Sequence, residues 1–181
     1  AAAQAPKVVI APSGTGKSAV LAAVAANLSH SCAVVARYIG ATPSSRDLRA
    51  LLSDLSDAIP TALGETPVPS NSDDPLKTLS QLLELARPDR PLVLIVDGLD
   101  QLNASDNAFA FEWLPKQVPA HCTIILSSAT GVTEDRLMDA HPEVQRIPLD
   151  PLERSMASQI MTTLLASNDR TITKTQHDSM L

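Results

Sequence analysis

The sequence predicts an α/β fold: a three-layer α/β/α sandwich in which helices cover both faces of a mostly parallel sheet. Three observations lead to this fold class. Short runs rich in Val and Ile alternate with longer segments of helical periodicity, the pattern of βαβ units. The short runs are apolar throughout, as expected for strands buried on both faces. With one Trp, one Tyr and two Phe, the core must consist mainly of Ala, Val, Leu and Ile.

Five short apolar runs are predicted to form the strands. Each is rich in Val, Ile or Leu, and most are bounded by residues such as Pro, Gly or Ser that interrupt a strand. In chain order, they are residues 7–11, 33–38, 91–96, 123–126 and 144–147. Because helical segments separate these runs, the strands are expected to lie parallel.

The helices are predicted from apolar residues spaced three and four apart. Residues 17–28 are rich in Ala and Leu without a helix breaker, which predicts a helix buried on most faces. Residues 44–59 should form a helix with Ser44 or Ser45 as its N-cap. Residues 75–86 open on a Pro, which suits the first turn of a helix. The other helices are expected at residues 107–114, 134–140 and 153–166, with one more beginning at 174.

Residues 60–74 are rich in Pro, Gly, Ser, Asn and Asp, which predicts an exposed loop. The order of the elements suggests two domains: residues 1–150 contain the sheet, and residues 151–181 begin a helical domain. Because the chain opens without Met and ends inside a predicted helix, we expect it to be a segment of a longer protein.

The composition argues against several classes of function. The formal net charge is −6, the isoelectric point is about 5.1, and basic residues are scattered, so nucleic acid is not an expected partner. No apolar run approaches the roughly 18 residues of a membrane span, and no secretory signal opens the chain. The protein is therefore expected to be cytoplasmic.

Most residues of reactive types have an ordinary structural interpretation. Cys32 and Cys122 lie in apolar runs without metal-ligand spacing, and are expected to be free thiols rather than a disulfide or metal ligands. The four histidines share no catalytic spacing and are expected to be structural or exposed. Arg37, at the end of the second strand, is expected to form a salt bridge or lie on the surface rather than to bind phosphate.

Residues 11–18 (APSGTGKS) match the phosphate-binding pattern G-x-x-x-x-G-K-[ST], with Ala11 in place of the first Gly. The segment follows a predicted strand and opens a predicted helix, so its backbone N–H groups and the helix N-terminus favour bound phosphates. Lys17 is expected to reach the β- and γ-phosphates, and Ser18 to ligate Mg²⁺. The pattern predicts a site for ATP or ADP with Mg²⁺. The residues of this segment expected to contact nucleotide are Pro12, Ser13, Gly14, Thr15, Gly16, Lys17, Ser18 and Ala19.

The predicted strand 91–96 is followed by Asp97, in the position of a Walker B acid. Ligands of open α/β sheets lie beyond the carboxyl ends of the strands, so Asp97 is expected to face Ser18 and hold Mg²⁺ directly or through water. Gly98 stands where many hydrolysing P-loop enzymes carry a Glu. Asp100 is the nearest other carboxylate, and it either polarises water or caps a turn.

The fourth predicted strand ends in Ser127 and Ser128. One of these hydroxyls either senses the γ-phosphate or caps a local turn, and Ser127 is our candidate for the nucleotide contact. The predicted catalytic residues are Lys17, Asp97 and Asp100, and the predicted metal ligands are Ser18 and Asp97.

Four segments together resemble the NACHT domain of STAND-class signal-transduction ATPases: VVIAPSGTGKSAVLAAVAANL, RYIGATPSSRDLRALLSDL, PLVLIVDGLDQL and EWLPKQVPAHCTIILSS. The likeness is nearest to NACHT domains joined to WD or tetratricopeptide repeats, including nephrocystin-like proteins. The DGLDQL and WLP segments are more particular to this family than the phosphate loop, which is generic to P-loop NTPases. The segment IPLDPLERSMASQIMTTLLASNDRTITKTQ resembles the family's passage into its helical domain.

The resemblance implies a P-loop NTPase fold and a switch in which ATP exchange and slow hydrolysis control assembly or signalling of a larger protein. It implies further domains in the same chain (helical, winged-helix, and WD or tetratricopeptide repeats), a nucleotide-dependent homo-oligomer, and a location at the cytoskeleton or cilium within the cytoplasm. Gln101 stands where many NACHT domains have a further acid, and no Arg follows the fourth strand; both departures argue against efficient hydrolysis. The residues that carry over from the family are Gly14, Gly16, Lys17, Ser18, Asp97 and Asp100.

Three functions remain open from the sequence. The first is the switch NTPase. The second is an interaction scaffold that keeps nucleotide as a structural ligand and scarcely hydrolyses it. The third is a small-molecule kinase, for which the sequence lacks an Arg-rich lid. The absence of an NKxD motif favours ATP over GTP without deciding between them.

Overall fold

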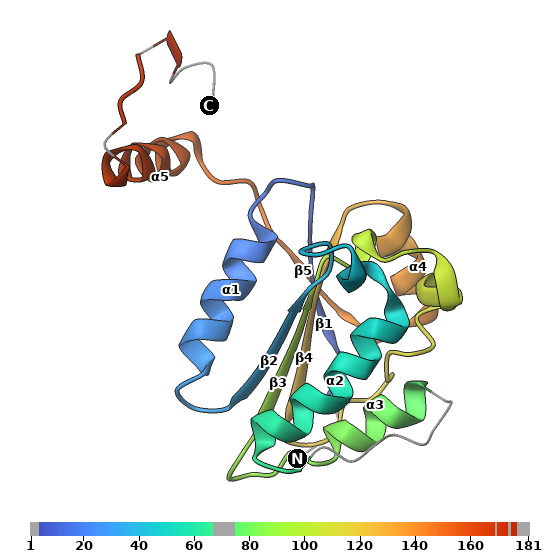
Figure 1. The fold of residues 1–181 in the computed structure, drawn as a ribbon. Helices are drawn as coiled ribbons and strands as arrows, with labels where there is room; N and C mark the ends of the chain where they lie inside the picture. The colour runs from blue at the N-terminus through green and yellow to red at the C-terminus, as the bar shows by residue number, and fades with distance from the viewer. Residues whose placement is uncertain (1–3, 67–74, 169, 174, 177–181) are drawn as a thin grey trace. The chain divides into compact units, whose positions relative to one another are not determined.

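The computed structural model describes residues 4–66, 75–168, 170–173 and 175–176 (Figure 1). The chain divides into two compact units, Ala1–Leu149 and Asp150–Leu181. The first unit contains the whole sheet. The second contains α5 (Arg154–Ser167), within two residues of its predicted bounds. The helix predicted from residue 174 lies outside the described residues, except for 175 and 176.

The sheet has five parallel strands: β1 (Lys7–Ala11), β2 (Ala33–Tyr38), β3 (Leu92–Asp97), β4 (Cys122–Ala129) and β5 (Gln145–Pro148). Their order across the sheet is β2-β3-β4-β1-β5. All five predicted strands are present, and β4 continues three residues beyond its predicted end because Ser127, Ser128 and Ala129 pair with β1. The strand β4 therefore lies between the strand that precedes the phosphate loop and the strand that ends in Asp97.

Helices cover both faces of the sheet, which confirms the three-layer α/β/α fold (Figure 1). One face is covered by α1 (Lys17–Leu28), whose Leu21 packs on Val9, Val93 and Ile95. The opposite face carries the larger core, formed with α2 (Leu48–Leu63), α3 (Pro75–Leu83) and α4 (Val132–Ala140).

The prediction that α1 is buried on most faces is wrong. Leu21 is its one fully buried residue, and Val20 is 41% exposed. Ala has the highest intrinsic helix propensity of any residue, so an Ala-rich segment forms a helix without needing burial on several sides. Ala-richness therefore predicted the helix correctly but did not indicate its burial.

The structure also corrects both ends of α2. Residues Ser44–Arg46 form a 3-10 turn, and the N-cap is Asp47, whose side chain accepts a hydrogen bond from the Ala50 N–H at 2.9 Å. Pro60 does not begin a loop: it is buried inside the helix, which continues to Leu63 and ends at Gly64 with φ 73°. Residues 60–63 therefore belong to α2, and residues 67–74 lie outside the described part of the chain.

The segment 107–114 is not the predicted α-helix. Residues Ser105–Ala110 form a 3-10 segment (η3) in which Asp106 and Asn107 have φ of 53° and 54°, and Phe111 ends it with φ 54°. Left-handed residues break the α-helical hydrogen-bond ladder. The apolar residues whose spacing predicted a helix instead form a compact aromatic cluster. In it, the centroid of the Phe111 ring lies 6.4 Å from the ring centroids of Phe109 and Trp113.

Cys122 is expected to resist thiol reagents as long as the protein is folded. Its Sγ donates to the Leu83 carbonyl at 2.9 Å, and burial raises the pKa of the thiol to about 11. Only the thiolate reacts, so at pH 8 about one molecule in a thousand is competent. In a Cys32→Ser protein, labelling by dithionitrobenzoate should therefore be slow and should accelerate with urea.

The half-buried Cys32, tested in a Cys122→Ser protein, is the comparison and should be labelled faster. Equal labelling rates in the two folded proteins would contradict the prediction. The raised pKa of Cys122 also has a consequence for stability: as the pH rises from about 8.5, the unfolded thiol ionises first, so the folded state loses stability until its own thiol ionises.

Candidate functional site

The phosphate loop lies between β1 and α1, as the sequence pattern requires. Gly14 and Gly16 have φ of 82° and 100°, in the left-handed region. A Cβ atom at either position would meet nothing within 4 Å. The positive φ, and not a lack of space, therefore favours glycine at both positions. Ala11 ends β1 in extended backbone, which explains how a residue other than Gly fits the first position of the pattern.

Lys17 folds back over this loop. Its Nζ donates to the carbonyl oxygens of Ala11 at 2.9 Å and Pro12 at 3.0 Å. The hydroxyl of Thr15 also donates to the Pro12 carbonyl, at 2.8 Å. The ammonium group is thus held at the loop by neutral acceptors, and among the described residues no carboxylate forms a hydrogen bond with it.

Ser18 and Asp97 meet although 79 residues separate them in the chain. The Ser18 hydroxyl, in the first turn of α1, donates to Oδ2 of Asp97 at 2.5 Å. Asp97 ends β3 and is only 5% exposed. The two residues predicted to hold Mg²⁺ therefore present their oxygens to the same point.

Ser127 also contacts Asp97, but from inside the protein. Its hydroxyl donates to Oδ1 of Asp97 and accepts from the Gly98 N–H at 2.9 Å. Ser127 is fully buried, with 0% exposure. The structure therefore places this hydroxyl beneath the carboxylate of Asp97, away from the surface where the predicted contact with a phosphate would occur.

Asp100 is exposed in a short 3-10 turn (η2, Leu99–Gln101) after β3. Its Oδ1 accepts from the Ala129 N–H at 2.8 Å and so links this turn to the end of β4. The sequence left two interpretations of Asp100 open, polarising water or capping a turn. The capping hydrogen bond is present for Oδ1. The other oxygen has no hydrogen bond among the described residues.

The loop after β2 lies against Asp97 and the turn that follows it, a contact that sequence reasoning missed. The Ile39 N–H donates to the Asp97 carbonyl at 2.9 Å. The side chain of Gln101 packs on Gly40 so closely that a Cβ there would lie 1.9 Å from Oε1 of Gln101. Gly40 was the available signal, because a glycine followed by small and polar residues marks a tight turn.

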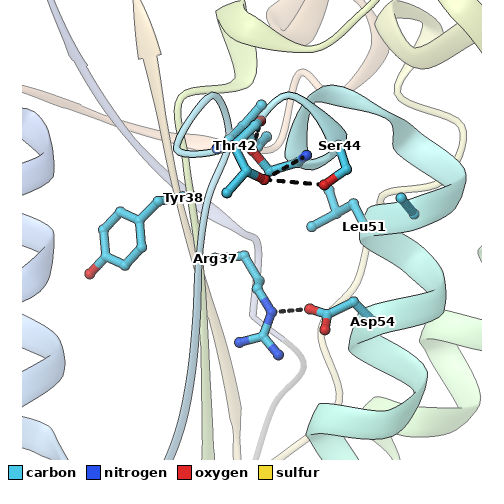
Figure 2. A pocket seen from close by; sticks show the side chains of 9 residues that line it. Arg37, Tyr38, Thr42, Ser44, Leu51 and Asp54 are labelled. Atoms are coloured by element: carbon cyan, nitrogen blue, oxygen red, sulfur yellow. Dashed lines mark hydrogen bonds and ion pairs between the residues drawn. The ribbon is translucent and has the colours of Figure 1, made fainter.

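A groove of about 450 Å³ lies between the end of β2 and α2 (Figure 2). The Arg37 guanidinium points into it and pairs with Asp54 of α2, while Tyr38 points to the other side of the strand (Figure 2). Side chains alternate between the two faces of a sheet along a strand, so Arg37 faces α2. The phosphate loop leads into α1, which covers the opposite face, and Arg37 therefore lies apart from it. Of the two roles predicted for Arg37, a salt bridge or a surface position, the salt bridge is present.

His141 has a structural role. Its ring is 2% exposed; Nε2 lies 2.9 Å from the Phe111 carbonyl oxygen, and Nδ1 lies 3.1 Å from Oε1 of Glu143. Burial opposes ionisation of Glu143, but hydrogen bonds from its own backbone N–H and from His141 lower the pKa of this carboxyl. His30 and His121 are exposed, as predicted, and His177 lies outside the described residues.

Within the described residues, no helix has both the length and the apolar character needed to cross a membrane.

A family model described as "AAA ATPase domain" matches residues 3–126. The chain is 32% identical over 148 residues to "NACHT and WD repeat domain-containing protein 2" of Homo sapiens, covering 79% of this chain and 8% of that protein. It is 27% identical over 191 residues to "NACHT domain- and WD repeat-containing protein 1" of Homo sapiens, covering 96% and 12%. The similarity to NACHT proteins predicted from sequence is confirmed, and the chain spans about a tenth of the length of these relatives.

Two solved structures share the fold of this chain. "Crystal structure of Cdc6p from Pyrobaculum aerophilum" aligns with a TM-score of 0.54 at 16% identity, over 87% of this chain and 42% of that one. "Structure of Drosophila ORC bound to DNA" aligns with a TM-score of 0.57 at 15% identity, over 93% and 45%. At these identities, the likeness supports the P-loop α/β fold alone.

Proposed function

The chain belongs to the AAA ATPase domain family, and we propose that it binds ATP with Mg²⁺ and acts as a slow switch ATPase within a longer protein. The observation that carries the proposal is the hydrogen bond between Ser18 and Asp97. It joins the phosphate loop to the acid of β3 at the carboxyl edge of the sheet, where ligands of open α/β sheets lie.

The residues present fit a nucleotide and Mg²⁺. The left-handed glycines shape the loop so that its N–H groups can point to phosphates, and α1 begins there without an acidic residue in its first turn. Lys17 would exchange its carbonyl partners for phosphate oxygens. Ser18 and Asp97 would hold Mg²⁺, which when bound neutralises phosphate charge. The other residues proposed to contact nucleotide are Pro12, Ser13, Thr15 and Ala19.

Slow hydrolysis is proposed because few groups are placed to activate water. Gly98 follows Asp97, so the position of the common catalytic Glu has no side chain. Asp100 remains the candidate, since one of its oxygens is without a hydrogen bond among the described residues while the other holds the Ala129 N–H. Because only one oxygen of Asp100 is available to a water molecule, we expect a low rate of ATP hydrolysis rather than a high one.

The switch role is proposed from the resemblance to the NACHT domains of signal-transduction ATPases, and the names of the relatives support repeat domains elsewhere in the same chain. Two of them are named for NACHT and WD repeats, and another, "Tetratricopeptide repeat protein 41" of Rattus norvegicus, is 31% identical over 90 residues, covering 45% of this chain and 7% of that protein. We infer that residues 1–150 form the nucleotide-binding domain and residues 151–181 begin a helical domain; the division after Leu149 supports this. Nucleotide-dependent self-assembly and a cytoplasmic location, at the cytoskeleton or cilium, belong to the same proposal.

The test combines ATP binding with phosphate release. A fluorescent ATP analogue is titrated into the chain with Mg²⁺, and phosphate release is followed on the same sample. The Asp100→Asn variant is the critical comparison, because the amide oxygen of Asn still accepts from the Ala129 N–H. We expect this variant to bind ATP as the parent does and to release phosphate at least about 100-fold more slowly, the smaller end of a general-base contribution.

The outcomes separate the candidate functions. Saturable binding by the parent without phosphate release would favour a scaffold that keeps nucleotide as a structural ligand. Equal release by the parent and by Asp100→Asn would remove Asp100 from the mechanism. Transfer of phosphate to an added alcohol or amine rather than to water would instead indicate a kinase. Competition by GTP and ATP in the same titration decides between the two nucleotides.

A further inference from the structure

We propose that Ser127 is a positioning residue, which fixes the carboxylate of Asp97 so that one of its oxygens serves Mg²⁺, and that it is not a phosphate sensor. The inference rests on the proposed function, because it concerns the ion that Asp97 would hold. It assigns to Ser127 a role beneath the metal site, where the residue touches neither nucleotide nor metal.

Strand register explains why Ser127 and not Ser128 reaches Asp97. In the β3–β4 pair, Val96 lies opposite Leu126, so the next residues, Asp97 and Ser127, are neighbours. Residues in register on parallel strands point to the same face, and Ile95, two residues before Asp97, packs beneath α1. Asp97 and Ser127 therefore share the face of the sheet on which α1 and Ser18 lie.

The hydrogen bonds fix the direction of each proton. The Gly98 N–H can only donate, so the Ser127 oxygen must accept there and its single hydroxyl proton goes to Oδ1 of Asp97. The Ser18 hydroxyl takes Oδ2. Two hydroxyls bound to different oxygens leave the carboxylate little freedom to rotate about its bond to Cβ.

This arrangement separates the two oxygens by function. Oδ1 is turned into the protein, where Ser127 is fully buried, and Oδ2 is turned toward Ser18 at the start of α1. A carboxylate that is held in one orientation binds a metal ion without first losing rotational freedom. Hydrogen-bond partners of metal ligands typically contribute about 10- to 100-fold to metal affinity.

Ser128 provides a matched control in the same strand. It is also fully buried, but its hydroxyl donates to the Ala129 carbonyl at 3.1 Å, and alternation along β4 directs it to the opposite face of the sheet. Ser127→Ala and Ser128→Ala each remove one buried hydroxyl from adjacent positions. A general effect of strand damage would therefore appear in both variants.

The experiment measures affinity for a fluorescent ATP analogue in EDTA and across a Mg²⁺ titration, for the parent chain and both variants. We expect Ser127→Ala to keep the affinity measured in EDTA and to need about 10-fold more Mg²⁺ for half of the Mg²⁺-dependent gain. We expect Ser128→Ala to match the parent in both conditions. Thermal unfolding of each variant without ligand reports any loss of folded protein.

Each other result overturns the inference. An unchanged Mg²⁺ requirement in Ser127→Ala shows that the hydroxyl does not position Asp97. Equal weakening with and without Mg²⁺, or a matching defect in Ser128→Ala, shows a structural role only. A parent that binds the analogue without any response to Mg²⁺ leaves nucleotide binding intact but removes the metal role. A parent that does not bind at millimolar concentrations overturns the proposed function itself, and this inference with it.

Discussion

Replacing Lys17 by Ala is expected to weaken ATP binding by about 10- to 100-fold. A charge-assisted hydrogen bond contributes roughly 1.5–3 kcal/mol, and each 1.4 kcal/mol is about tenfold in affinity. Without nucleotide, the Lys17 Nζ already donates to Ala11 and Pro12, so binding exchanges acceptors rather than creating hydrogen bonds from nothing. The expected loss of binding free energy is therefore limited to the difference between a hydrogen bond to an anionic phosphate oxygen and one to a neutral carbonyl oxygen. The measurement is a titration with a fluorescent ATP analogue in the presence of Mg²⁺.

The same variant should remain folded. The two carbonyl oxygens released by the mutation lie in the phosphate loop, where Pro12 is exposed and water can replace the lost donor. Thermal unfolding without nucleotide should therefore be close to that of the parent, and the same nucleotide concentration should raise the melting temperature of the parent more than that of the variant. Lys116→Ala, at an exposed position far from the loop in sequence, is the matched control for removing one positive charge. Equal affinity in Lys17→Ala and the parent would contradict the assignment of the loop.

The sequence predicted elements reliably where a single local signal decides the structure. The buried strands and the Ala-rich helix α1 are such cases, and β1 and α1 have their predicted bounds. Errors arose where competing signals had to be weighed. Asp47 and not Ser44 or Ser45 is the N-cap, and Pro60 lies buried in the last turn of α2. Those choices depend on tertiary packing, which no local pattern contains.

The candidate site was predicted in its parts but not in its connections. The motif located Lys17 and Ser18, and the end of an apolar strand located Asp97. The role that we propose for Ser127 depends on the register between β3 and β4, a relation between segments 30 residues apart. The sequence analysis chose Ser127 over Ser128 as the candidate for a phosphate contact, and the alternation along the strand shows instead that only Ser127 faces Asp97.

The largest expected effect on stability is that of Phe111→Ala, about 3–5 kcal/mol off the free energy of unfolding. Phe111 is fully buried and lies between the rings of Phe109 and Trp113 at the centre of the aromatic cluster. Its backbone has φ 54°, and Ala adopts that conformation no more readily than Phe, so the mutation leaves the backbone strain in place. A loss of this size is a large part of the 5–15 kcal/mol typical of a domain.

The contacts of the cluster allow the ring's contribution to be isolated. The backbone carbonyl of Phe111 accepts from His141, and this hydrogen bond is available to Ala as well. Phe109→Ala is the comparison: that ring is half-buried, faces the Arg136 guanidinium at 5.8 Å and should cost about 1–2 kcal/mol. Urea unfolding by circular dichroism, together with the emission of the buried Trp113, measures both variants. Similar midpoints for Phe111→Ala and Phe109→Ala would mean that the cluster collapses around the missing ring, since the cost of a cavity depends on how far its walls can close.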